Sequence, residues 1–236
     1  IAIGCPLIHN NVLYNTAFII FEGKILGIVP KSYIPNYSEF YEKRWFTAAA
    51  MLTDELVALP FQENIPFGTN LIFAAGDYKF GIEICEDLWV TIPPSSYLSL
   101  LGANIIGNLS ASNELVSKKD YRLSLIANQS ARCMSSYIYS SAGVHESTTD
   151  LLFSGHLVIS ENGTILKENN RFQRENEVIT SCIDVFKLNA ERLKNLSYRD
   201  SSKIVPFKPK NINFNFKNTK INNFDRYIDK HPFVPS

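Results

Sequence analysis

The sequence has no paired cysteines and no cluster of metal-binding side chains. Its four cysteines, Cys5, Cys85, Cys133 and Cys182, stand far apart without a C-x-x-C pair, and its four histidines are equally dispersed. Disulfide frameworks and zinc sites need such residues at short, repeated spacings. We therefore expect free thiols in a reduced, cytoplasmic compartment, and no metal centre.

Long apolar runs are also absent. No run approaches the ~20 residues of a membrane helix, and the opening IAIGCPLIHN lacks the basic region and cleavage pattern of a signal peptide. No glycine-rich ATP-binding loop occurs in residues 1–236. We expect no membrane partner and no nucleotide site in this chain. A hydrophobic content of 45%, with 16 Phe and 11 Tyr, argues against disorder and predicts a packed core.

The formal net charge is zero, but the charge is unevenly distributed. Residues 1–186 hold 12 basic and 19 acidic side chains, whereas residues 187–236 hold 11 and 4. A basic end can bind nucleic acid, but this one is rich in Asn and has no RNA-binding motif. We favour a tail that docks on the acidic body or leads to another domain, and we expect no nucleic-acid partner.

Turn signals divide the chain into hairpins and strand–helix–strand units. Hairpins are expected at 11–31, 70–85 and 155–168, because Glu22-Gly23-Lys24, Gly76-Asp77 and Asn162-Gly163 separate apolar runs. Apolar spacing of three and four predicts a helix over 118–136. Further expected elements are a buried strand at 1–7, a short helix ending near 98–101, strands at 104–109, 137–142 and 177–185, and a helix at 186–195. Such alternation predicts mixed α/β layers.

Cys85 is the first candidate for chemistry, in the stretch GIEICEDLWV (81–90). It ends a strand-like run, and a nucleophile at such a strand-to-turn junction is exposed and rigidly held. A thiol of ordinary pKa ~8.5 needs a base or a cation to ionise, and the acids Glu86 and Asp87 would oppose ionisation. The alternative is a buried, unreactive thiol, which we assign to Cys5, Cys133 and Cys182.

Lys31 supplies a candidate cation. It ends the apolar run ILGIVP, where an unpaired lysine is costly, and Glu39 follows eight residues later among tyrosines and phenylalanine. A lysine can stabilise both a thiolate and an oxyanion, and a nearby carboxylate would keep it charged and oriented. Residue counting supports equally a simple salt bridge within the charged loop that also holds Glu42, Lys43 and Arg44.

Four longer motifs connect these residues to a known family. PKSYIPNYSEFYEKRWF (30–46), GIEICEDLW (81–89), NLSASNELVSKKDYR (108–122) and AGVHESTTDLLFSGHLVISENGTIL (142–166) resemble the nitrilase, or carbon–nitrogen hydrolase, superfamily. Within it they look like the glutaminase domains of glutamine-dependent NAD+ synthetases. The closing HPFVPS resembles the junction into the synthetase domain of those enzymes.

The resemblance implies an αββα sandwich of four layers and a Glu-Lys-Cys triad that acts on an amide. In it, Cys85 is the nucleophile, Lys31 stabilises the tetrahedral intermediate, and Glu39 supports the lysine and the substrate. Residues expected to line the glutamine pocket are Tyr37, Glu86, Ser112 and Lys118. Charge complementarity pairs Lys118 with the substrate carboxylate and Glu86 with its α-ammonium. No cofactor is expected in this domain; ATP, Mg and deamido-NAD belong to the synthetase domain. Expected partners are glutamine, that domain and further copies of the chain.

One feature of the family pattern has no match. Its general base is a glutamate well upstream of the lysine, whereas the first acid here, Glu22, lies in a hairpin turn. We expect residues 1–196 to form a glutaminase-like domain without its first strand and helix, and residues 197–236 a basic arm toward an absent synthetase domain. Such a fragment should have little activity, since a general base contributes on the order of 10²–10⁴-fold. Alternatives are a stand-alone amidase for another small amide, and a catalytically silent scaffold.

Overall fold

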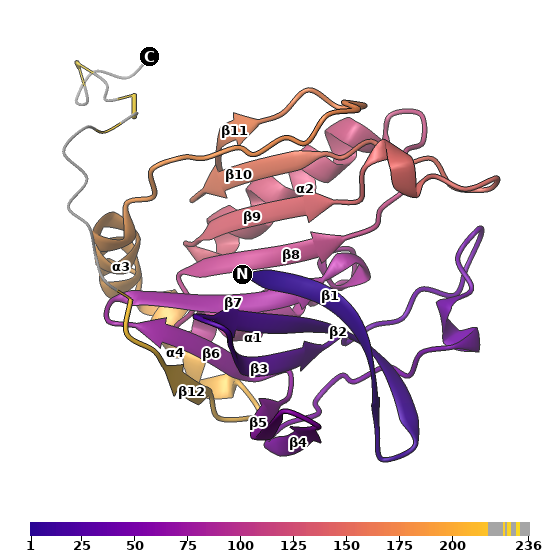
Figure 1. Cartoon of the computed structure of the whole chain (residues 1–236). Helices are drawn as coiled ribbons and strands as arrows, with labels where there is room; N and C mark the ends of the chain where they lie inside the picture. Colours follow the sequence, from indigo (N-terminus) through magenta and orange to yellow (C-terminus); the bar gives the residue numbers. More distant parts are fainter. Residues whose placement is uncertain (217–223, 225, 228–229, 232–236) are drawn as a thin grey trace.

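Two β-sheets lie face to face in the computed structural model, which describes residues 1–216, 224, 226–227 and 230–231 (Figure 1). In the described residues the smaller sheet has the order β1-β2-β3-β5-β4 and the larger β11-β10-β9-β8-β7-β6-β12. The strands of the smaller sheet are β1 (Ala2–His9), β2 (Val12–Phe21), β3 (Lys24–Pro30), β4 (Glu55–Leu59) and β5 (Gln62–Phe67). Those of the larger sheet are β6 (Leu71–Ala75), β7 (Tyr78–Ile84), β8 (Ile105–Ser110), β9 (Ser136–Ser141), β10 (Leu157–Glu161), β11 (Thr164–Glu168) and β12 (Lys210–Asn213).

Helices cover the face of the larger sheet that points away from the smaller one (Figure 1). The α-helices of the described residues are α1 (Pro94–Leu100), α2 (Lys118–Cys133), α3 (Val185–Lys194) and α4 (Leu196–Ser201), and single 3₁₀ turns form at Glu42–Arg44, Cys85–Leu88, Val144–Glu146 and Ser202–Ile204. Leu98 of α1 and Ile126 of α2 pack with Tyr137 and Val158 of the sheet in one fully buried cluster. A mixed α/β sandwich, as predicted, is therefore present.

A second apolar layer joins the two sheets. Ala17 and Val29 of the smaller sheet pack against Phe73, Ile82 and other residues of β6 and β7. Both faces of β6 and β7 are thus covered, which explains why β6, LIFAA, is apolar throughout. β7, β8 and β9 are parallel neighbours, so their carboxyl ends lie at the same edge of the sheet.

The three predicted hairpins are confirmed. β2 pairs with β3, β6 with β7, and β10 with β11, all antiparallel. Gly23 and Gly163 have φ of 78° and 91° in the turns, a backbone region that suits glycine. The predicted helices also form, α2 beginning at the predicted residue and α3 one residue earlier than expected.

Three expectations about the strands were wrong or incomplete. β1 forms as predicted but is largely exposed rather than buried, and Cys5 with it, because β1 is an edge strand. Residues 177–185 form no strand; Val178 is 86% exposed and Asp184 instead caps α3. The hairpin of β4 and β5 was not anticipated, and it extends the smaller sheet beyond β3.

The described part of the basic end lies against the body of the chain. β12 pairs with β6 in parallel, and Phe214 joins the layer between the sheets. Arg226 makes an ion pair with Glu161, as expected for a basic tail on an acidic surface. Of the closing HPFVPS motif, residues 232–236 lie outside the described residues. None of the described helices has both the length and the apolar character needed to cross a bilayer.

Candidate active site

The carboxyl ends of β3 and β7 bring Lys31 and Cys85 together. Lys31 follows β3 directly and is 1% exposed, while Cys85 follows β7 and is 8% exposed. Both line one cavity of about 450 Å³, together with residues of β1, β8 and β9. Cys85 has a φ of 50°, a region that non-glycine residues rarely occupy. Cys85 thus has the predicted position at the end of a strand, in a strained backbone conformation, but its side chain is buried and not exposed as expected.

Asp87 connects the segment after Lys31 to the turn at Cys85 through hydrogen bonds. Its carboxylate accepts hydrogen bonds from the backbone N–H groups of Ile84 (2.9 Å) and Tyr33 (2.9 Å), with Ser32 N–H at 3.4 Å. Asp87 is 1% exposed, and this burial raises the pKa of its carboxyl to about 7, helped by the neighbouring charge of Glu83. Asp87 therefore holds the strand ends that carry Lys31 and Cys85 in one fixed arrangement.

Glu42, not Glu39, is the carboxylate that contacts Lys31. Lys31 Nζ donates to Glu42 Oε2 at 2.8 Å, and Glu42 lines the cavity that holds Lys31 and Cys85. Glu39 was predicted to support Lys31, but the contact to the lysine comes from Glu42. The loop after Lys31 turns back through the 3₁₀ turn at Glu42–Arg44, and this turn brings the later glutamate to the ammonium.

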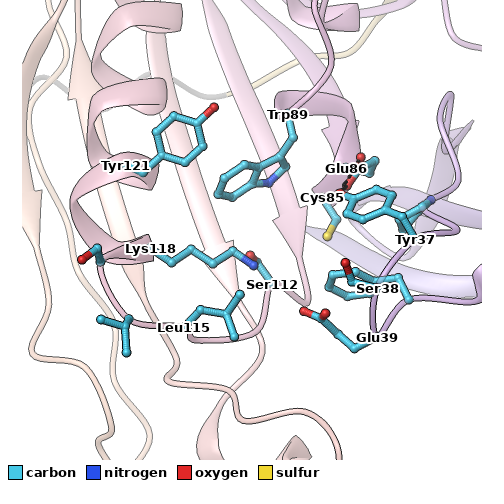
Figure 2. A pocket seen from close by; sticks show the side chains of 14 residues that line it. Tyr37, Ser38, Glu39, Cys85, Glu86, Trp89, Ser112, Leu115, Lys118 and Tyr121 are labelled. Carbon is cyan, nitrogen blue, oxygen red and sulfur yellow. Dashed lines mark hydrogen bonds between the residues drawn. The ribbon is translucent and has the colours of Figure 1, made fainter.

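Glu39 lies in a second cavity, also of about 450 Å³, on the other side of Cys85. It accepts a hydrogen bond from Asn113 Nδ2 at 2.5 Å, and Asn113 Oδ1 accepts one from Lys118 Nζ at 2.5 Å. Lys118 also lies over the rings of Trp89 and Phe40, at 5.2 and 5.8 Å from the ring centroids. Figure 2 shows Lys118 extending from α2 across the cavity toward Ser112.

The remaining predicted pocket residues line the same second cavity. Tyr37 donates through its hydroxyl to both carboxylate oxygens of Glu86, at 3.0 and 2.9 Å. Burial raises the pKa of Glu86, against the opposing effects of the Tyr37 hydrogen bond and the Lys31 charge. Ser112 is 3% exposed and also lines the cavity. All four pocket residues that the sequence suggested therefore surround one space, together with Glu39 and Cys85 (Figure 2).

Burial also affects the pocket cation. It lowers the pKa of Lys118, and the positive charge of Arg122 acts in the same direction, while the Cys85, Glu39 and Glu114 charges oppose it. The pKa of Glu39 is lowered by a backbone hydrogen bond, by Asn113 and by Lys118. The cavity thus presents two acidic groups, a basic group and a thiol to one space.

Sequence reasoning gave Asn113 no role and did not foresee the backbone contacts of Asp87, whereas a salt bridge of Lys31 that includes Glu42 was one of the alternatives left open. Asn113 lies in the polar run SASNE directly after buried β8, which was a usable signal. The described residues contain no group of three or more His, Cys, Asp or Glu side chains placed to hold a metal ion.

Comparison with known proteins agrees with this arrangement. The carbon–nitrogen hydrolase family matches residues 1–190, which include both cavities and the strands that position them. The chain belongs to the carbon–nitrogen hydrolase family. Its sandwich of two sheets is the fold of that family's solved members.

Several proteins of similar sequence are glutamine-dependent NAD(+) synthetases. The chain is 36% identical to a glutamine-dependent NAD(+) synthetase of Mycobacterium leprae, over all of this chain and 35% of that protein. It is 39% identical to the corresponding enzyme of Mycobacterium bovis, over 85% of this chain and 30% of that protein. The crystal structure of such a synthetase from Cytophaga hutchinsonii aligns with a TM-score of 0.66 and 26% identity, over 74% of this chain and 28% of that one. The carbon–nitrogen hydrolase chain thus spans about a third of the length of these curated relatives.

Proposed function

We propose that this chain is the glutamine-hydrolysing part of a glutamine-dependent NAD+ synthetase. The observation that carries the proposal is the position of Cys85 between two cavities. One is lined by the Lys31–Glu42 ion pair and the other by Glu39, Glu86 and Lys118. The resemblance of the whole chain to synthetases of that name supports this choice of substrate over other amides.

In the proposed reaction, the Cys85 thiolate attacks the side-chain carbonyl carbon of glutamine. The predicted general base returns the proton of the Cys85 thiol to the leaving nitrogen, the C–N bond breaks, and ammonia leaves while a thioester remains on Cys85. Water then adds to the thioester carbonyl carbon and the C–S bond breaks, which gives glutamate and the free thiol. Lys31 stabilises the negative oxygen of each tetrahedral intermediate, since its ammonium is buried and oriented by Glu42. An upstream glutamate as general base stays a prediction, and Glu22 is exposed in its turn.

The second cavity suits the amino-acid end of glutamine. Lys118 binds the α-carboxylate, and Glu86 binds the α-ammonium with the Tyr37 hydroxyl holding it in place. Glu39 shares the α-ammonium with Glu86, and Ser112 completes the lining. The aromatic rings beside Lys118 restrict its hydration, which strengthens its attraction for an anion.

The ammonia released would serve a synthetase domain that uses ATP and Mg to amidate deamido-NAD+. This part of the proposal rests on the names of the relatives, which are about three times as long as this chain. Assembly into homo-oligomers and a cytoplasmic location belong to the same proposal. This domain is proposed to need no cofactor for hydrolysis.

Covalent labelling tests the proposed substrate. An electrophilic glutamine analogue, such as a diazoketone of glutamine shape, should modify Cys85, and added L-glutamine should protect it, as read by peptide mass spectrometry. Exposed Cys5 is the internal control, because iodoacetamide should modify it whether or not glutamine is present.

The same experiment separates the alternatives. Protection by another small amide but not by L-glutamine would favour a different amidase. Failure of every electrophile to label Cys85 faster than buried Cys133 would favour a silent scaffold and overturn the proposal.

A further inference from the structure

Asn113 links the two opposite charges of the second cavity. Its amide nitrogen donates to Glu39 Oε1 and its amide oxygen accepts from Lys118 Nζ, each at 2.5 Å. Asn113 is 2% exposed, whereas Glu39 and Lys118 are both partly open to the cavity. A buried neutral amide thus lies between two charged groups that point into one space.

The amide keeps these two charges from neutralising each other. Lys118 and Glu39 form no direct ion pair, although both contact Asn113. A direct pair would satisfy each charge with the other and would have to be broken before a charged ligand could bind. An asparagine offers one donor side and one acceptor side, so it can contact both groups while separating them.

Both charged groups keep hydrogen-bonding capacity for a ligand. A lysine ammonium has three donors, and only one is used by Asn113. A carboxylate can accept about four hydrogen bonds, and the side-chain contact with Asn113 occupies one position on Glu39. The separated pair therefore matches a ligand that carries a positive and a negative group of its own.

The chain around Asn113 is held firmly. The next residue, Glu114, is buried and accepts hydrogen bonds from Arg122, from Ser154 Oγ at 2.6 Å and from Arg171 Nη1 at 2.9 Å. Its backbone N–H donates to Leu152 O at 2.7 Å. These contacts join the segment to α2 and to the following loops, so the Asn113 amide has a fixed position.

We propose that Asn113 is a specificity-determining positioning residue, whose amide holds Glu39 and Lys118 apart at a spacing that selects a zwitterionic α-amino acid amide. This inference rests on the proposed function. It adds a reason why a simple amide, or an amide with only one charged group, is a poor ligand: such a molecule leaves one of the two held charges without a partner.

The test measures selectivity rather than activity alone. Dissociation constants are measured by calorimetry for L-glutamine, for 4-aminobutanamide, which lacks the α-carboxylate, and for glutaramic acid, which lacks the α-amino group. The wild-type chain should prefer L-glutamine to both by tenfold or more. The Asn113→Leu variant, of similar size but without polar atoms, should lose most of this preference. The rate at which iodoacetamide modifies Cys85 should stay within about twofold, because this reagent carries no charge to be recognised.

Two further variants keep the test interpretable. Asn113→Asp places a negative charge against Lys118 and pairs with it directly, so it should weaken glutaramic acid, an anion, more than 4-aminobutanamide, a cation. Asn211→Leu changes an exposed asparagine of β12 and should leave all three affinities unchanged.

Each outcome decides a different claim. If the wild-type chain shows no preference for L-glutamine, the proposed function fails and this inference with it. If the wild-type chain has the preference and a folded Asn113→Leu or Asn113→Asp variant keeps it, only the inference is overturned. Loss of the preference together with slow labelling of Cys85 would indicate general damage to the site and would also count against it.

Discussion

Replacing Glu42 with glutamine should destabilise the protein far more than the same change at Glu39. The Lys31 ammonium is 1% exposed and lies 2.8 Å from Glu42 Oε2. At an effective dielectric constant of about 20, two charges at this distance attract with about 6 kcal/mol. Breaking a buried pair by removing one partner typically costs about 3–5 kcal/mol, and we take about 3 because Glu42 keeps 28% of its side chain exposed.

The measurement is thermal unfolding at pH 7, followed by circular dichroism. For a chain of this size, about 3 kcal/mol corresponds to a midpoint about 6–12 °C lower in Glu42→Gln. Glu39→Gln is the matched control: Glu39 bonds to the neutral amide of Asn113 and not to a buried ammonium, and a glutamine can still offer Asn113 a carbonyl oxygen. We expect its midpoint to fall by no more than about 3 °C.

The same two variants also distinguish the two glutamates in function. Glu42→Gln should slow labelling of Cys85 by the glutamine-shaped electrophile even at saturating reagent, whereas Glu39→Gln should mainly raise the reagent concentration needed. If Glu39→Gln proves the more destabilising change, or if both variants melt alike, the assignment of Glu42 to Lys31 is wrong.

Three further predictions concern other contacts. Burial raises the pKa of Asp87 from 3.8 to about 7, so the stability that this group contributes is complete below about pH 4 and is lost as the pH rises through 7. Urea unfolding at pH 4 to 8 should therefore show the wild type losing stability relative to Asp87→Asn as the pH rises. Tyr37→Phe should change stability by less than about 1 kcal/mol, because Tyr37 is 53% exposed, yet should weaken L-glutamine binding severalfold by freeing Glu86; unchanged affinity in calorimetry would contradict this. Arg192→Lys should cost about 2–3 kcal/mol in urea unfolding, because the guanidinium donates to the carbonyls of Gly102, Ala103, Cys133 and Met134 and an ammonium cannot reach them all.

Local signals predicted the hairpins, while burial depended on neighbours far along the chain. Asn162-Gly163 and Gly76-Asp77 specify turns through their own backbone preferences, so their hairpins could be placed from sequence. The run at 177–185 has β-branched residues but no strand beside it, and a strand needs a partner for its N–H and C=O groups. β1 looked buried because it is apolar, yet its exposure follows from its edge position in the sheet.

For helix α2, the apolar spacing predicted the helix but not all of its buried residues. Its apolar spacing predicted the helix and placed Ile126 on the inner face. Arg122 and Gln129 are buried on the same helix, Arg122 by its pairing with Glu114 and Gln129 by hydrogen bonds to Ser95 and other partners. Polar residues buried through specific partners cannot be recognised by hydrophobicity, because the partners come from distant segments.

The candidate site also contains residues that could be predicted from sequence and residues that could not. Cys85 and Lys31 each follow a strand that could be predicted from sequence, but the two strands belong to different sheets, so only the resemblance to the family predicted that the two residues meet. The choice between Glu39 and Glu42 could not be predicted, because the loop after Lys31 is irregular and neither helical nor strand spacing applies to it. Asn113 escaped notice because a neutral amide has no charge to suggest a role, although it contacts both charged groups of the cavity.

The carboxylates around Cys85 have separate partners, and this explains how an acid-rich segment can hold a nucleophilic thiol. Glu83 accepts from the Tyr137 hydroxyl and from Ser95 N–H at 2.7 Å, on the buried side of β7. Asp87 is occupied by backbone N–H groups, and Glu86 by the Tyr37 hydroxyl. Each carboxylate is therefore held by donors of its own, and the two lysines that share a cavity with Cys85 come from elsewhere, Lys31 from the end of β3 and Lys118 from the start of α2. An acid in the next position of the sequence need not act on the thiol, because the turn at Cys85 directs successive side chains to different sides.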